Sequence, residues 1–201
     1  MFDARLRPLI DPPLNAVGRG LARLGITANI VTLAGIVLAV AAGVVLAQGH
    51  YTLGLALVVA NRLLDGLDGA VARATRMSDF GGYLDIVGDF LFYLAVPMGF
   101  GLADPANLRP ALALLFCFGL TGISFLAFAT LAAKRGLETT AHGKKSFFYN
   151  TGLAEGTETI AVFIAICLWP QHFAAIAYGY AGLCLITVAQ RTAAARAVFR
   201  D

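Results

Sequence analysis

The chain has 201 residues, of which 59% are apolar and only 13% are charged, and its formal net charge is +3. Soluble domains are usually about half apolar and a quarter charged, so this composition excludes an ordinary soluble protein. Together with a mean hydropathy of +0.77, it indicates an integral membrane protein.

The first 26 residues mix arginines with leucines and contain no long apolar run. Between Leu14 and Leu24, apolar residues recur at helical spacing, opposite Arg19 and Arg23. This pattern predicts an amphipathic helix that lies in the membrane interface. The Asp-Pro-Pro sequence at 11–13 is typical of a helix start and predicts that the helix begins there.

Six apolar stretches follow, each near the roughly 20 residues that a helix needs to cross a bilayer. They lack the alternating pattern of a membrane β-strand, so we predict an all-α fold. We expect one membrane domain over residues 1–201, with an interfacial helix at 1–26 and a six-helix bundle at 28–190. The predicted spans are residues 28–48, 51–73, 80–102, 110–133, 153–169 and 172–190. Three cysteines in these spans, predicted to be buried, are Cys117, Cys167 and Cys184.

Basic residues gather in alternate connections between the predicted spans. They precede the first span, follow the second and the fourth, and close the chain, whereas the opposite side has only Arg109. The excess of Lys and Arg on cytoplasmic loops predicts that both termini and the segment 65–89 face the cytoplasm. Topology and attraction to anionic lipid account for the positive charge without a nucleic-acid partner.

Four aspartates stand at the predicted cytoplasmic ends of the second and third spans. Asp65 and Asp68 share one helix face at 100° per residue, as do Asp85 and Asp89, and one short loop joins the two helices. A charged group inside a bilayer costs about 3 kcal/mol, so the carboxylates need protonation or bound cations. All-oxygen ligands favour Mg²⁺, Mn²⁺ or Ca²⁺, and the stretch has no His or Cys for zinc.

Small residues and one arginine lie beside these acidic faces. Glycines can admit a ligand or a second helix backbone close to the carboxylates. Arg73 follows Asp68 by five residues and, together with metal ions, would suit a diphosphate. The pattern predicts phosphoryl transfer at a membrane surface. The glycines concerned are Gly66, Gly69, Gly81 and Gly82.

The spacing Asp65-x2-Asp68-Gly69-x2-Ala72-Arg73-x7-Gly81-x3-Asp85-x3-Asp89 resembles the signature of the CDP-alcohol phosphotransferases throughout. The segment 27–32, Thr-Ala-Asn-Ile-Val-Thr, is also similar to the family, although Ala28 stands where proline is usual. The resemblance implies a homodimer that transfers a phosphatidyl or other substituted phosphate group from a CDP-linked lipid, such as CDP-diacylglycerol, to an alcohol. CMP is released.

The resemblance also implies roles for individual residues. Two divalent ions, Mg²⁺ or Mn²⁺, would be held by the four aspartates, and Asp89 would also be the general base for the acceptor hydroxyl. Residues expected to contact the CDP moiety are Gly69, Ala72, Arg73 and Gly81.

The acceptor alcohol is less clearly encoded. Phe90 follows Asp89 where the glycerol phosphate branch commonly has lysine, and LDIVGDFLFYLAVP is loosely similar to the serine branch. Serine is therefore favoured over glycerol phosphate, inositol phosphate, choline or a lipid alcohol. We expect Arg62 to pair with Glu158 or Glu155, although acidic residues also suit a helix N-terminus. The candidate acceptor pocket comprises Arg62, Lys144, Lys145, Glu155 and Glu158.

Two other functions use acidic membrane helices. A membrane prenyltransferase also binds Mg²⁺-diphosphate, but its acidic motifs lie far apart, whereas here they fall within 25 residues. A cation transporter would require ionisable groups through the full membrane depth. The first, fourth and sixth spans have almost none in their apolar cores.

Overall fold

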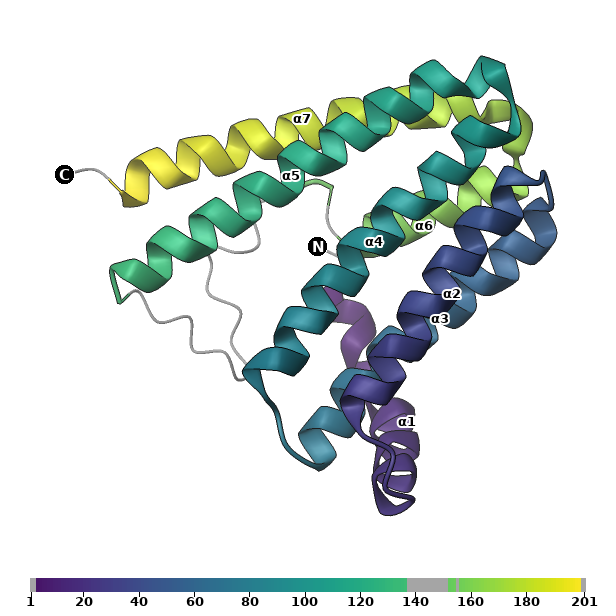
Figure 1. The fold of residues 1–201 in the computed structure, drawn as a ribbon. Helices are drawn as coiled ribbons and strands as arrows, with labels where there is room; N and C mark the ends of the chain where they lie inside the picture. Colours follow the sequence, from purple (N-terminus) through teal and green to yellow (C-terminus); the bar gives the residue numbers. More distant parts are fainter. Residues whose placement is uncertain (1–2, 137–151, 155, 200–201) are drawn as a thin grey trace.

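The computed structural model describes residues 3–136, 152–154 and 156–199, without the side chains of residues 3–9. The regular elements in these ranges are helices, as predicted (Figure 1). The six that follow α1 in these ranges are α2 (Ala28–Ala47), α3 (Tyr51–Ala74), α4 (Asp79–Ala103), α5 (Leu108–Lys134), α6 (Gly156–Leu168) and α7 (Phe173–Val198). They begin and end within a few residues of the predicted apolar stretches, except that α7 continues eight residues beyond the predicted end at residue 190. Short 3₁₀ turns, η1 (Pro105–Asn107) and η3 (Pro170–His172), precede α5 and α7.

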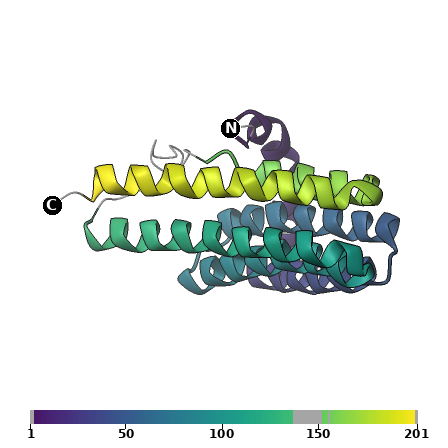
Figure 2. The ribbon, with the colours of Figure 1, turned by 90° about the horizontal axis from the view of Figure 1, so that it is seen from above.

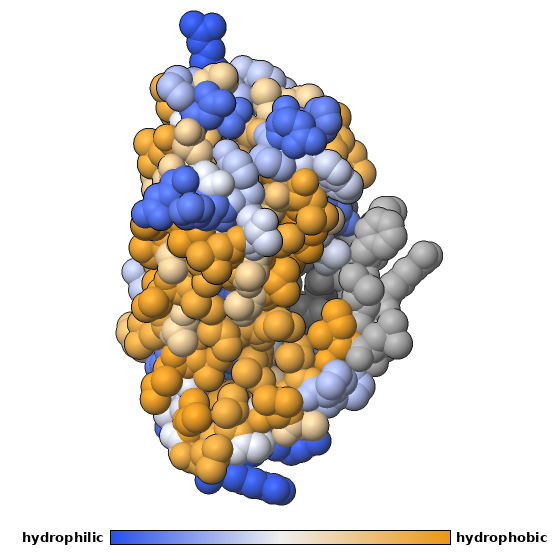
Figure 3. Space-filling model, turned by 90° about the vertical axis from the view of Figure 1, so that its right-hand side faces the viewer, coloured by the Kyte–Doolittle hydropathy of each residue, from blue (hydrophilic) through white to orange (hydrophobic). Residues whose placement is uncertain are grey.

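Four segments of the described chain are long and apolar enough to cross a membrane: Ala28–Ala47, Asp79–Ala103, Pro105–Lys134 and Pro170–Val198. Helix α6 is apolar but has 13 residues, and α3 contains four charged residues, Arg62, Asp65, Asp68 and Arg73. Hydrophobic residues cover the central part of one face of the molecule (Figure 3). These features define an integral membrane protein, and six spans remain a prediction.

Helix α1 (Asp3–Arg23) is longer than predicted. The expected start at residues 11–13 is wrong, because the helix begins at Asp3 and continues through Pro12 and Pro13. Three prolines, Pro8, Pro12 and Pro13, lie inside the helix and lack backbone N–H donors, and the helix packs against α3. A Cβ added at Gly18 would lie 2.8 Å from the Cβ of Ala70, so the two backbones approach closely. The interfacial position of α1 stays a prediction.

Helix α2 begins where the sequence predicts. Thr27 has an extended backbone, with φ −87° and ψ 155°, and Ala28 is the first helical residue. Ala28, which stands where the family usually has proline, is therefore the first residue of the helix. Gly25 and Gly49 flank α2 with φ of +79° and +78°, a conformation that favours glycine in tight turns.

The helices pack in two groups. Helix α2 packs against α3 and α4, and α5 runs beside α7 in both ribbon views (Figures 1 and 2). Helix α4 contacts α5, and α3 contacts α1 and α6. A core joins these contacts, and its fully buried rings are Phe92, Phe100, Phe163 and Phe173. The three cysteines are also buried, which confirms their prediction as buried small side chains.

Glycines bring α2 and α4 into backbone contact. A Cβ added at Gly99 would lie 2.6 Å from the carbonyl oxygen of Gly43 and 2.8 Å from the Cβ of Leu46. At Gly43, an added Cβ would lie 2.9 Å from the carbonyl oxygen of Ala95. Neither position has room for a side chain, so the spacing of α2 and α4 depends on these two glycines.

Candidate active site

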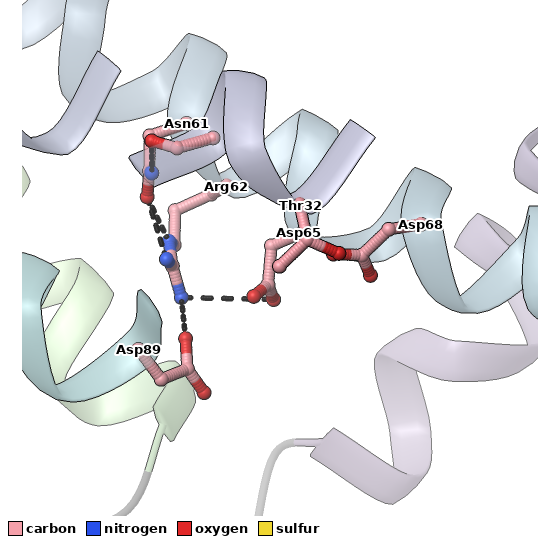
Figure 4. Close-up of polar contacts among 7 residues, drawn as sticks. Thr32, Asn61, Arg62, Asp65, Asp68 and Asp89 are labelled. Atoms are coloured by element: carbon pink, nitrogen blue, oxygen red, sulfur yellow. Dashed lines mark hydrogen bonds and ion pairs between the residues drawn. The ribbon is translucent and has the colours of Figure 1, made fainter. Parts of the chain in front are cut away.

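Carboxylates from α3 and α4 converge on one guanidinium group. Arg62 Nη1 donates to Asp89 Oδ1 at 2.8 Å and lies 3.6 Å from Asp65 Oδ2 (Figure 4). Asp65 belongs to α3 and Asp89 to α4, so the predicted convergence of the two acidic faces is present for this pair. Because both carboxylates reach the same nitrogen atom, they are close enough to share one cation.

Asn61 fixes the guanidinium from the other side. Its Oδ1 accepts from Arg62 Nε at 2.8 Å and from Nη2 at 2.5 Å. Its Nδ2 donates to the carbonyl oxygen of Gly35 on α2 at 2.7 Å. The Arg62 Cζ also lies 3.9 Å from the centroid of the Phe92 ring, a cation–π contact. Three helices therefore hold Arg62 in place.

The other two aspartates occupy the same region. Asp68 is buried, and its Oδ2 accepts from Thr32 Oγ1 on α2 at 2.7 Å. Asp85 lies on α4, one helical turn before Asp89. Sequence reasoning did not identify Thr32 as a partner of the acidic cluster, although Thr32 closes the segment that resembles the family's first helix entry.

The aspartates do not form a closed metal cage. Across the described ranges, no group of three or more Asp, Glu, His or Cys side chains is arranged to hold an ion. Like charges repel, and Arg62 and Thr32 already engage oxygens of three of the four carboxylates. The donor set itself fits a hard divalent cation, because all four side chains offer carboxylate oxygens from two adjoining helices.

The residues expected to contact CDP lie toward the ends of α3 and α4 that the short loop joins. A Cβ added at Gly69 would lie 3.2 Å from Arg73 Nη1, so Gly69 leaves room for that guanidinium. Arg73 donates to Asn15 Oδ1 on α1, from Nη2 at 3.0 Å and from Nε at 3.4 Å. Sequence reasoning missed Asn15, because no local spacing connects residues 58 positions apart.

Gly81 and Ala72 stand at the ends of α4 and α3 that meet at the short loop. Gly81 N donates to Ser78 Oγ at 3.1 Å, which caps the start of α4. A Cβ added at Gly81 would lie 3.1 Å from Asn29 Oδ1, so the first turns of α4 and α2 are close neighbours. Ala72 lies in the last turn of α3, one residue before Arg73.

The predicted acceptor pocket is only partly within the described chain. Lys144, Lys145 and Glu155 lie outside the described residues. Glu158 is in the first turn of α6, a helix that packs against α3. Arg62 pairs with Asp89 and Asp65 rather than with Glu158. The physical reason is proximity: Asp65 is three residues along the same helix, and Asp89 faces it from α4.

Helix α7 fixes the start of α6. Thr187 is fully buried, and its Oγ1 accepts from the backbone N–H groups of Leu153 and Ala154 at 3.1 and 2.9 Å. One turn into α6, the hydroxyl groups of Thr159 and Tyr180 are 2.7 Å apart. These contacts hold the N-terminal end of α6 at a fixed place beside α3.

Residues 25–190 match the family model of CDP-alcohol phosphatidyltransferase. The match covers most of the chain, so the protein belongs to this family, as its motif indicates. It is 48% identical over 194 residues to inner membrane protein YnjF of Escherichia coli K12, covering 95% of this chain and 93% of that one. It is 36% identical over 100 residues to archaetidylinositol phosphate synthase of Pyrococcus horikoshii, covering 49% and 53% of the two chains.

Solved structures share the fold. A crystal structure of Mycobacterium tuberculosis phosphatidylinositol phosphate synthase, PgsA1, with CDP-DAG bound has a TM-score of 0.68 and 24% identity, covering 91% of this chain and 93% of that one. The same enzyme in complex with manganese and citrate has a TM-score of 0.67 and 25% identity, covering 90% and 88%. Family membership favours a CDP-alcohol phosphatidyltransferase over a membrane prenyltransferase or a cation transporter.

Proposed function

We propose that this protein transfers a phosphatidyl, or other substituted phosphate, group from a CDP-linked lipid such as CDP-diacylglycerol to an alcohol. The observation that carries the proposal is the convergence of Asp65 and Asp89, from two helices, on one cationic atom within the motif of this family. The CDP-DAG complex of PgsA1 supports the choice of donor.

The reaction exchanges one phosphorus–oxygen bond for another. The acceptor oxygen attacks the lipid-linked phosphorus, the bond from that phosphorus to the bridging oxygen of CMP breaks, and CMP leaves with the bond electrons. Asp89 is the proposed base that takes the proton of the acceptor hydroxyl. Arg73 pairs with the diphosphate, whose bridging oxygen gains charge as CMP leaves.

The four aspartates are the proposed ligands of two divalent ions, Mg²⁺ or Mn²⁺. When bound, such ions neutralise charge on phosphoryl oxygens and acidify a coordinated hydroxyl. The all-carboxylate donor set and the manganese complex of PgsA1 support this part of the proposal.

The acceptor stays open between an uncharged and a phosphorylated alcohol. Phe90 after Asp89 favours serine over glycerol phosphate. The names of the archaeal relatives and of PgsA1 make an inositol phosphate the main rival. A phosphorylated acceptor would need basic partners, and Arg62, Lys144 and Lys145 are the candidates, with Glu155 and Glu158 nearby in sequence.

We also propose that the protein is a homodimer with both termini and the active site at the cytoplasmic face. The family resemblance supports the dimer. The distribution of Lys and Arg supports the orientation, since α3 and α4 meet at a loop that contains Arg76 and follows Arg73.

Release of CMP tests the proposed function. Purified protein is incubated with CDP-diacylglycerol, Mn²⁺ or Mg²⁺, and serine, inositol 1-phosphate, glycerol 3-phosphate or choline in separate reactions. We expect CMP and a new phospholipid, identified by mass, with one acceptor, and neither product in EDTA. Absence of CMP with every acceptor, from protein that is folded and metal-loaded, would contradict the proposal.

A substitution on α1 tests the placement of Arg73. We expect Asn15→Ala to raise the KM for the CDP-linked lipid about three- to tenfold with little change in kcat, because Arg73 loses its side-chain partner. The measurement is initial rate against lipid concentration in mixed micelles. Arg19→Ala, on the same helix and exposed, is the matched control. An unchanged KM in Asn15→Ala would show that Asn15 does not position Arg73.

A further inference from the structure

Arg62 is an unusual component of an acidic site, because its charge lies between the carboxylates rather than outside them. Only 11% of its side chain is exposed. Burying an unpaired guanidinium is costly, so a position like this requires partners of opposite charge. Arg62 has them in Asp89, at 2.8 Å, and Asp65, at 3.6 Å.

Contacts with Asn61 and Phe92 fix the orientation of the Arg62 guanidinium relative to these carboxylates. Asn61 is 3% exposed and binds two of the guanidinium nitrogens, and it is itself tied to the backbone of Gly35. The Phe92 ring covers one face of the guanidinium. The third nitrogen, Nη1, is the one that points to Asp89 and Asp65 (Figure 4).

We propose that Arg62 is a built-in counter-cation that neutralises Asp65 and Asp89 before a divalent ion binds, and that it thereby sets the affinity of the site for that ion. The inference rests on the proposed function, since it takes both aspartates as metal ligands. A positive charge beside the ligands weakens binding of a second cation, and its removal leaves the carboxylates repelling one another.

This role accounts for a buried guanidinium that lies between carboxylates of α3 and α4. The arginine stabilises the fold when no ion is present, and ion binding must compete with it. A CDP-linked lipid adds negative charge of its own, so the nucleotide and the ion favour each other's binding. The site therefore loads its ion together with its substrate.

Ion binding without nucleotide tests the inference, and its readout does not depend on activity. Free Mn²⁺ is measured by electron paramagnetic resonance during titration of the wild type, Arg62→Met, Arg62→Gln and Arg62→Lys. We expect Arg62→Met and Arg62→Gln to bind Mn²⁺ about tenfold more tightly or better, because one positive charge is lost near the ligands. Arg62→Lys keeps the charge and is expected to stay near wild type. Arg76→Met removes an equal charge from the exposed loop and is the matched control.

Thermal unfolding provides the second measurement. We expect Arg62→Met to unfold at a lower temperature than the wild type in EDTA and to recover most of the difference in Mn²⁺. Arg62→Gln, which retains a polar side chain, decides the outcome if the methionine variant yields no folded protein. Failure of both variants to fold in Mn²⁺ would overturn the inference.

The outcomes separate this inference from the proposed function. If the wild type binds Mn²⁺, and Arg62→Met and Arg62→Gln bind it with the same affinity, the counter-cation role alone is overturned. Binding by the variants but not by the wild type supports it. If neither the wild type nor any variant binds Mn²⁺ or Mg²⁺, the metal site and the inference both fail.

Discussion

Asp89→Asn is expected to lower the rate of CMP release about a hundred- to ten-thousandfold, the range typical for loss of a general base. Asparagine has nearly the same size as aspartate but cannot accept the acceptor's proton and is a poor ligand for a hard divalent ion. The variant also loses the 2.8 Å ion pair with Arg62, the contact that joins α3 to α4 at the site. Initial rates at saturating lipid and acceptor measure the effect.

The control for this experiment lies on the same helix. Asp79 is exposed in the first turn of α4, and Asp79→Asn removes an equal charge without touching the site. We expect Asp79→Asn to retain most of the wild-type rate. More than a tenth of wild-type activity in Asp89→Asn, with normal Mn²⁺ binding, would show that Asp89 is neither base nor essential ligand.

Gly99→Ile is expected to destabilise the fold by about 2 to 3 kcal/mol, the upper range for overpacking of a close contact. The Cβ of the new side chain would lie 2.6 Å from the carbonyl oxygen of Gly43. A backbone atom cannot relieve this contact by a change of rotamer, as the end of a flexible side chain could. Helices α2 and α4 must then separate. Because α2 contributes Thr32 and the carbonyl of Gly35 to the site, activity should fall with stability.

A glycine without close neighbours supplies the comparison. An added Cβ at Gly119, inside α5, meets nothing within 4 Å, so Gly119→Ile is expected to leave the thermal midpoint near that of the wild type. Both variants are measured by thermal unfolding in the same detergent. Equal midpoints for Gly99→Ile and Gly119→Ile would show that the α2–α4 contact is not limiting for stability.

Much of the helical arrangement follows from the sequence because apolar runs and their polar breaks are local signals. The structure places α2 to α6 within a few residues of the predicted stretches, and α7 begins as predicted but runs eight residues past the predicted end. The approach of Asp65 and Asp89 also follows from helix geometry, since 100° per residue and one short loop bring their faces together. The start of α1 was misplaced because proline usually marks a first helical turn, whereas contacts with α3 support the helix through Pro12 and Pro13.

The partners of the site residues were harder to predict. Helical spacing alone could have paired Arg62 with Asp65, three residues away, but it could not give the contact with Asp89. Asn15 and Thr32 come from other helices, and only tertiary packing brings them to Arg73 and Asp68. Long-range contacts of this kind leave no periodic trace in the sequence.

The burial of the three cysteines makes the chain suited to chemical mapping. Cys117, Cys167 and Cys184 are at most 5% exposed, so a water-soluble maleimide has little native thiol to modify. A single cysteine introduced at exposed Arg76 would therefore be labelled selectively. Applied to sealed vesicles, an impermeant reagent would then reveal on which side of the bilayer the connection between α3 and α4 lies, with every native sulfur left in place.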